Sequence, residues 1–270
     1  GRMADRSRRY HPGAVKLMLD GVCENFTARS LTPYLDAAGH PTANFGMDYI
    51  DPEALPGFVT AVMARGMQPH FHALGDAAVR SALDAVAAAR AVLGWSDTRP
   101  HLAHLQIVHP DDVGRFRTLG VAANAQALWA CADAAMTELT MPFLGEPRSS
   151  WQYPFGDLVR AGAVLAMGSD WSVTSADPLP QIAVAVTRRV PGDPGSEPFL
   201  PGQAITIGDA LTAFTAGSAW VNHREAASGT LAVGYDADLV ILDGDPFAVD
   251  DVGSLRVSET IVRGETVYKR

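Results

Sequence analysis

Residues 67–94, MQPHFHALGDAAVRSALDAVAAARAVLG, contain one complete strand-then-helix unit, and this stretch decides the fold. The apolar run Met67–His72 predicts a strand. Gly75-Asp76 then begins an alanine-rich helix, and Gly94 is a typical helix stop. Because strands that alternate with helices form a parallel sheet with the helices outside, repetition of this unit predicts an α/β fold.

Four further apolar runs predict strands of the same sheet, namely Ala14–Leu19, Pro100–His104, Val121–Gln126 and Ala163–Met167. Helices are expected from the Asp51-Pro52-Glu53 start to Gly66, over Asp111–Leu119, around Leu158–Arg160, and from the capping-box pattern Thr206-x-x-Asp209 through Ala219. A (β/α)8 barrel needs eight strands, and an open sheet of five leaves two unpaired edges. We therefore expect the chain to be the C-terminal part of a longer protein, completed by missing sequence or by a second polypeptide.

From Gly229 onward the pattern changes. The segments GTLAVGYDADLVILDGDPF and RVSETIVRGETVYKR consist of short alternating runs separated by turn pairs, most clearly Arg263-Gly264. Such runs predict antiparallel strands of a small β-subdomain rather than further strand–helix units. We expect a partial barrel over residues 1–225 and the β-subdomain over residues 226–270.

The composition is typical of a soluble protein with a large core. The chain has 270 residues, of which 47% are hydrophobic and 19% charged. A net charge of −9 without a block of Lys or Arg argues against a nucleic-acid partner. No apolar run approaches the roughly 20 residues of a membrane-spanning helix, and residues 1–13 lack the apolar core of a signal peptide. Cys23 and Cys131 cannot build a disulfide framework, and free thiols favour a cytoplasmic location.

Four chemically active side chains lie at or near the ends of predicted strands: Lys16, His72, His104 and Asp170. The strand ends of a parallel barrel gather on one face, which is where such barrels carry their chemistry. Two imidazoles, a carboxylate and a lysine at that face indicate a metal site. Asp170 follows Gly168-Ser169, which lets the backbone turn sharply, and its carboxylate can take a proton from a metal-bound water. The alternatives are a buried core histidine for His72 and a helix N-cap for Asp170.

The remaining histidines are expected to be structural or exposed. His70 shares a face with His72 but lies deeper, so a structural role is preferred. His101 and His104 are three residues apart, which predicts opposite faces of the strand. His11, His40, His109 and His223 fall in loops or helix starts.

Lys16 needs a chemical change before it can bind a metal. An ammonium group repels a cation, so Lys16 alone indicates a structural lysine or an anion-binding residue. Reaction of its amine with carbon dioxide would give a carbamate, which is an anion.

Several segments together resemble the amidohydrolase superfamily, in particular the branch that contains N-substituted formamide deformylases and related amide hydrolases. They are VKLMLDGVCENFTARSLTPY, HFHALGDAAV, AHLQIVHPDDVGRF, GSDWSVTSADPL and GTLAVGYDADLVILDGDP, in the family's motif order. The resemblance implies a (β/α)8 TIM barrel with strands 4–8 in this chain and strands 1–3 outside it, plus the C-terminal share of a flanking β-sandwich.

The resemblance also implies one or two divalent metals, usually zinc. A carbamylated Lys16 would end strand four, His72 and His104 would be ligands from strands five and six, and Asp170 would be a ligand and proton shuttle from strand eight. The family's first strand carries a His-x-His metal-binding pair, which this chain lacks.

The leading functional hypothesis is hydrolysis of a non-peptide amide or related C–N bond in a small molecule by a metal-activated water. Tyr34, Trp129 and Trp171 are candidate walls of the substrate pocket, with plain packing as the alternative. A second hypothesis keeps the same water activation but assigns a lactone or phosphoester as substrate. A third is a truncated or degenerate homologue that binds metal or ligand without catalysis, or serves in an assembly, including a homo-oligomer.

Overall fold

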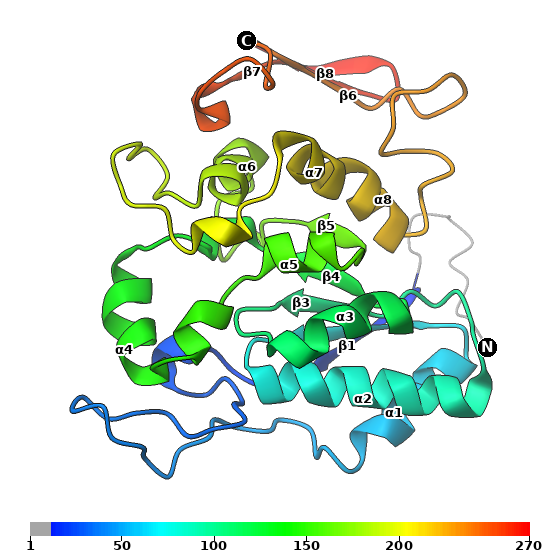
Figure 1. The fold of residues 1–270 in the computed structure, drawn as a ribbon. Helices are drawn as coiled ribbons and strands as arrows, with labels where there is room; N and C mark the ends of the chain where they lie inside the picture. The colour runs from blue at the N-terminus through cyan, green and yellow to red at the C-terminus, as the bar shows by residue number, and fades with distance from the viewer. Residues whose placement is uncertain (1–11) are drawn as a thin grey trace.

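A parallel sheet forms the centre of the structure, which is a computed structural model that describes residues 12–270 (Figure 1). Within those residues its strands run in sequence order, each paired with the next, which confirms the predicted parallel α/β sheet. The strands are β1 (Ala14–Met18), β2 (Gln68–Ala73), β3 (His101–His104), β4 (Ala122–Ala125) and β5 (Leu165–Met167).

Helices follow the strands along the chain. They are α1 (Leu55–Ala64), α2 (Asp76–Leu93), α3 (Pro110–Leu119), α4 (Met141–Leu144), α5 (Phe155–Arg160), α6 (Pro178–Thr187), α7 (Ile207–Thr212) and α8 (Ser218–Val221). The capping box predicted at Thr206 is present and begins α7. Helix α1 begins later than predicted because Asp51 caps a preceding turn, where its carboxylate accepts the N–H of Glu53. Helices α4 and α6 are absent from the sequence prediction.

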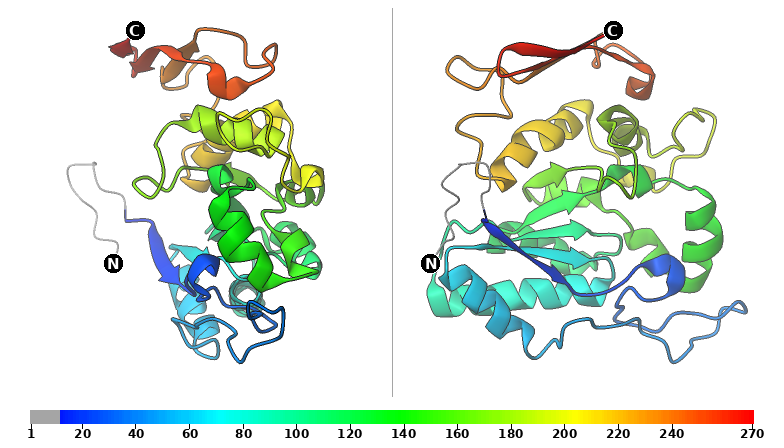
Figure 2. Two further views of the ribbon diagram at one scale, coloured as in Figure 1. Left: turned by 90° about the vertical axis from the view of Figure 1, so that its left-hand side faces the viewer. Right: turned by 180° about the vertical axis from the view of Figure 1, so that it is seen from behind.

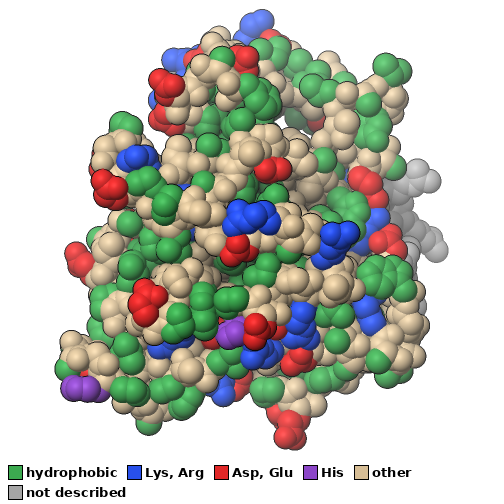
Figure 3. All heavy atoms as spheres, viewed as in Figure 1, with side chains coloured by type: hydrophobic (Ala, Val, Ile, Leu, Met, Phe, Trp, Pro, Cys, Tyr) green, Lys and Arg blue, Asp and Glu red, His purple; other side chains and the backbone are tan. Residues whose placement is uncertain are grey.

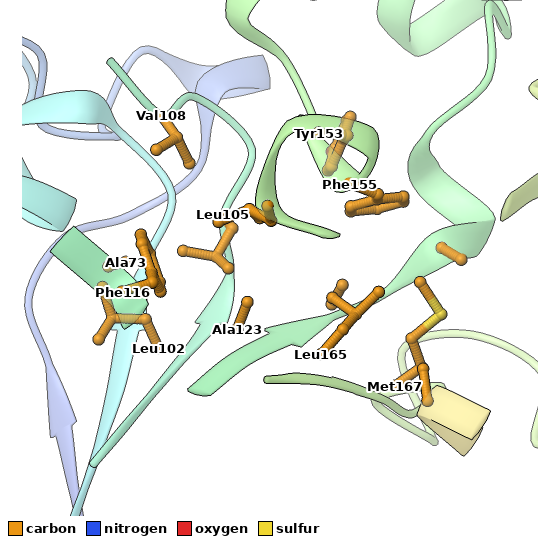
Figure 4. Packing of buried hydrophobic residues seen from close by; sticks show 14 of the residues in the cluster. Ala73, Leu102, Leu105, Val108, Phe116, Ala123, Tyr153, Phe155, Leu165 and Met167 are labelled. Atoms are coloured by element: carbon orange, nitrogen blue, oxygen red, sulfur yellow. The ribbon is translucent and has the colours of Figure 1, made fainter. Parts of the chain in front are cut away.

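Helices α1, α2 and α3 pack against one face of the sheet, and on the other face His101, Ala122 and Ala166 are also buried. Figures 1 and 2 show α1, α2 and α3 on one side, whereas strands β1 to β4 lie in front when the molecule is seen from behind. Ala78, Ala82, Ala85 and Ala89 of α2 are all buried at helical spacing, and their small side chains allow a close approach. Figure 4 shows part of the buried apolar cluster, in which Leu102 of β3 and Phe116 of α3 take part.

A second, antiparallel sheet lies at one end of the molecule, at the top of Figure 1. It consists of β6 (Leu239–Leu242), β7 (Val257–Val262) and β8 (Glu265–Lys269), in that order. Arg263 and Gly264 connect β7 and β8, and both have positive φ, as a tight hairpin turn requires. The predicted antiparallel strands are thus confirmed, although residues 229–238 form no strand.

Three features of the described residues relate to the expectations about membranes, nucleic acids and disulfides. No helix within residues 12–270 combines the length and apolar character needed to cross a membrane. Lys and Arg side chains are interspersed with acidic ones on the face in Figure 3. Cys23 and Cys131 are both buried free thiols.

Candidate active site

A cavity of about 570 Å³ lies at the ends of the parallel strands and brings together most of the residues predicted from the sequence. Its lining includes Lys16 of β1, His72 of β2, His104 of β3, Asp170 after β5, and Trp129. Glu24, Asp133, Gln106 and Tyr153 also line it. Side chains from segments about 150 residues apart in sequence therefore share one cavity.

His72 and His104 form the centre of this site. Their ring centroids are 4.5 Å apart in an edge-to-face arrangement, and the His104 ring stacks on Trp129 at 5.5 Å. Burial lowers the pKa of His104 to about 3 and also lowers the pKa of His72. Both imidazoles are therefore neutral at pH 7, which is the form that offers a lone pair to a metal.

His101 and His104 lie on the same face of the sheet, so the predicted separation onto opposite faces is wrong. The His101 ring packs on His70 at 4.1 Å, while His104 packs on His72, and His70 and His72 share a face of β2. The reason is the backbone of His104, whose φ of 81° departs from strand geometry and breaks the simple alternation.

Lys16 contacts a residue that the sequence analysis treated as structural. Its Nζ lies 3.1 Å from Nε2 of His70, the residue beside it in the parallel register of β1 and β2. Burial is the main cause that lowers the pKa of Lys16, and Asp170 opposes the shift. Burial and the nearby Lys16 lower the pKa of His70 to about 4, so His70 is neutral and its Nε2 can accept from the amine. The contact between Lys16 and His70 depends on the register of β1 and β2. That register cannot be read from the sequence, so no sequence signal predicts this contact.

Asp170 faces the cavity from a turn with positive φ. The alternative that it caps the next helix is wrong, because the side chain of Asp177 caps α6 by accepting the N–H of Leu179. The carboxylate of Asp170 is therefore not committed to a helix N-terminus.

Two of the predicted pocket residues lie elsewhere. Tyr34 is buried in a separate apolar cluster with Cys23 and Leu144, where its hydroxyl donates to the carbonyl of Ala28 at 2.8 Å. Trp171 is 74% exposed and does not line the cavity. Only Trp129 of the three candidate wall residues lines the cavity, because Tyr34 is drawn into the packing of its own long loop.

The other histidines take no part in the cavity. His40 and His223 are exposed, and His109 caps α3 by accepting the N–H of Asp111. His11 lies outside the described residues.

Asp20 is a residue near the site that the sequence analysis missed. Its carboxylate is fully buried and accepts the backbone N–H groups of Arg29, Leu74 and Gly75. Burial raises the pKa of Asp20 to about 7, although these three hydrogen bonds oppose the shift. Asp20 Oδ1 lies 3.8 Å from Nε2 of His72. In the sequence, Asp20-Gly21 indicates only a turn at the end of the first strand.

The donor set has the chemistry of a metal site but does not make a complete one. Within residues 12–270, no group of three or more His, Cys, Asp or Glu side chains is arranged so that it could hold a metal ion. The Nδ1 atom of His104 is nonetheless buried with no hydrogen-bond partner. Two adjacent neutral imidazoles, one of them with an unsatisfied ring nitrogen, fit a divalent metal, and further donors would have to join them.

Comparison with known proteins gives consistent matches. The sequence model described as "Amidohydrolase family" matches residues 3–268. The chain is 29% identical over 260 residues to the putative amidohydrolase YtcJ of Bacillus subtilis, covering 96% of the chain and 47% of that protein. It is 27% identical over 208 residues to the N-substituted formamide deformylase of Arthrobacter pascens, covering 76% and 37%.

A solved structure agrees with these matches. An uncharacterised metal-dependent hydrolase from Pyrococcus horikoshii is similar with a TM-score of 0.74 and 29% sequence identity, covering 90% of the chain and 46% of that chain. The chain thus spans about half the length of the relatives it matches.

Proposed function

The chain belongs to the amidohydrolase family, and we propose that it carries part of the active site of a metal-dependent hydrolase that cleaves a non-peptide amide or related C–N bond. The observation that carries the proposal is the meeting of Lys16, His72, His104 and Asp170 in one cavity. The similarity to a protein named N-substituted formamide deformylase supports the choice of a C–N bond.

The proposal includes a barrel that other sequence completes. The strands β1 to β5 would be strands 4–8 of a (β/α)8 barrel, and strands 1–3 would come from an N-terminal segment or a second polypeptide. Two features support this: the solvent-exposed Met18 on edge strand β1, and the match to about half the length of the relatives. The C-terminal sheet would belong to a flanking sandwich.

The residues that would hold the metal are His72, His104, Asp170 and Lys16 as its carbamate. Carbon dioxide reacts with a free amine to give a carbamate and a proton, and the lowered pKa of Lys16 favours the free amine. When bound, a divalent metal supplies Lewis acidity and lowers the pKa of water.

The chain's own groups would bind the substrate and move the proton. The carboxylate of Asp170 would accept a proton from the attacking water and return it to the nitrogen of the departing amine. Trp129 stacks on His104 and would hold that ring in place while forming an apolar wall for the acyl or amine substituent.

The proposal is tested by metal content and turnover of the full-length protein. We expect bound zinc, hydrolysis of N-substituted formamides that stops on chelation, and a loss of about 10²–10⁴-fold in kcat for Asp170→Ala. His40→Ala is a matched control, because His40 is exposed and lies outside the cavity. If the protein hydrolyses lactones or phosphoesters and not formamides, the proposed C–N substrate is wrong and the proposal of a hydrolase stands.

A non-catalytic homologue is the second candidate, favoured by the absence of a three-residue metal cluster within the described part of the chain. It predicts no bound zinc and no measurable effect of Lys16→Ala on any turnover. If the full-length protein behaves in that way, the hydrolase proposal is wrong.

A further inference from the structure

We propose that Asp20 is a positioning residue that, together with the carbonyl of Gly21, fixes the orientation and tautomer of His72. The inference rests on the proposed function in that His72 is taken as a functional ligand. It goes beyond that function by assigning a role to a fully buried carboxylate outside the cavity lining.

Asp20 lies between three segments of the chain. One oxygen, Oδ2, accepts the N–H of Arg29 at 2.9 Å and of Gly75 at 2.8 Å, and Oδ1 accepts the N–H of Leu74 at 3.1 Å. Leu74 and Gly75 form the turn that begins two residues after His72, between the end of β2 and the N-terminus of helix α2. A carboxylate at that end of the helix also interacts favourably with its dipole. Asp20 therefore ties the end of β1 to the turn that follows His72.

The segments that Asp20 joins are closely packed. A Cβ atom on Gly75 would lie 2.0 Å from the carbonyl oxygen of Arg29, and one on Gly21 would lie 1.9 Å from Oγ1 of Thr27. Neither position has room for a side chain, so both glycines are needed for this approach. The carbonyl of Arg29 in turn accepts the N–H of Ala77 in the first turn of α2. The turn after His72 is thus held by two contacts, one from the carboxylate of Asp20 and one from the carbonyl of Arg29.

The environment of the His72 ring determines which of its nitrogens carries the proton. Its Nε2 lies 3.2 Å from the carbonyl oxygen of Gly21 and 3.8 Å from Oδ1 of Asp20. A carbonyl oxygen can only accept a hydrogen bond, so Nε2 must carry the proton when the imidazole is neutral. The lone pair is then on Nδ1. Hydrogen bonds of this kind determine which nitrogen of a histidine remains free to bind a ligand.

Asp20 could instead act only as a helix cap, and the two roles predict different spectra. The tautomer of His72 is read from two-bond ¹⁵N–¹H correlations in the metal-free, ¹⁵N-histidine-labelled full-length protein, with His72→Gln for assignment. We expect the Nε2–H form in the wild type and a mixture of both tautomers in Asp20→Ala. A wild-type His72 in the Nδ1–H form would overturn the inference, and this measurement needs no variant at Asp20 to fold.

Asp76→Ala is the matched control. Asp76 is also a buried carboxylate at the start of α2, where it accepts the N–H of Leu31, but no bond joins it to His72. Both variants should lose stability through α2, and only Asp20→Ala should change the His72 spectrum. If the spectrum is unchanged in a folded Asp20→Ala, Asp20 is only a cap and the inference is wrong.

Zinc affinity gives a second readout. Loss of a group that orients a metal ligand weakens metal binding by roughly 10–100-fold, and we expect that change in chelator competition for Asp20→Ala and not for Asp76→Ala. An unchanged affinity in Asp20→Ala would count against the inference. The tautomer of His72 is measured without metal or substrate. The result therefore tests the role of Asp20 even if the hydrolase proposal fails, and the two failures can be told apart.

Discussion

The two sheets of this molecule bury their side chains to very different extents. The parallel sheet β1–β5 has a helix-covered face packed with apolar side chains, and its strand ends surround the cavity. Every residue of β8 in the C-terminal sheet is exposed, and Val240, Val267 and Tyr268 are large apolar side chains open to solvent. In the first region burial lowers the pKa values of His70, His101 and His104. This difference in burial predicts that substitutions, metal binding and salt will affect the two sheets to different extents.

The largest effect is expected in the core beside the parallel sheet. Phe116 of α3 is completely buried, and truncation of such a side chain to alanine costs about 3–5 kcal/mol. Val267→Ala in β8 is the matched apolar truncation at an exposed site and should change stability by less than about 0.5 kcal/mol. Urea denaturation of the full-length proteins measures both. Equal losses would show that β8 is covered by something else in the whole protein.

Metal binding should stabilise one region and not the other. At a free zinc concentration 100 times the Kd, binding to the native state adds about 2.7 kcal/mol. Hydrogen exchange should slow at the ends of β2 and β3, which carry His72 and His104, and stay unchanged in β6–β8. His104→Ala should abolish the protection. Protection that persists in His104→Ala would place the zinc elsewhere.

The parallel sheet and its site could be predicted from the sequence because local patterns determine them. Each strand is a short apolar run and most helices begin or end at a recognisable signal, such as the capping box of Thr206. Lys16, His72, His104 and Asp170 were predicted from their place at strand ends, and all four line one cavity.

The features that were missed depend on contacts between distant segments. The His70–Lys16 pair follows from the register of two strands 54 residues apart, and the shared face of His101 and His104 follows from one unusual φ. Asp20 accepts hydrogen bonds from the backbone N–H groups of Arg29 and Gly75, which have no sequence signature. Propensity and periodicity describe neighbours along the chain, so these contacts could not be predicted from them.

A smaller effect is expected from a residue that the cavity excludes. Tyr34→Phe removes the hydroxyl that donates to Ala28 in a buried cluster and should cost about 1 kcal/mol of stability. It should leave KM for substrate unchanged, whereas Trp129→Ala should raise KM because Trp129 lines the cavity. Thermal unfolding and steady-state kinetics of the two variants separate packing from substrate contact. A raised KM in Tyr34→Phe would show that Tyr34 contacts the substrate after all.

The smallest effect is expected from an ion pair on the C-terminal sheet. Nζ of Lys269 lies 3.7 Å from Glu259 across β7 and β8, and the lysine is 72% exposed. Solvent screens such a pair, so Lys269→Ala should cost less than about 0.5 kcal/mol and even less at 0.5 M salt, where the Debye length falls to roughly 4 Å. Denaturation at low and high salt measures the difference. A loss of more than 1 kcal/mol that salt does not reduce would mean that Lys269 is buried against another surface in solution, and the contrast in burial between the two sheets would then be wrong.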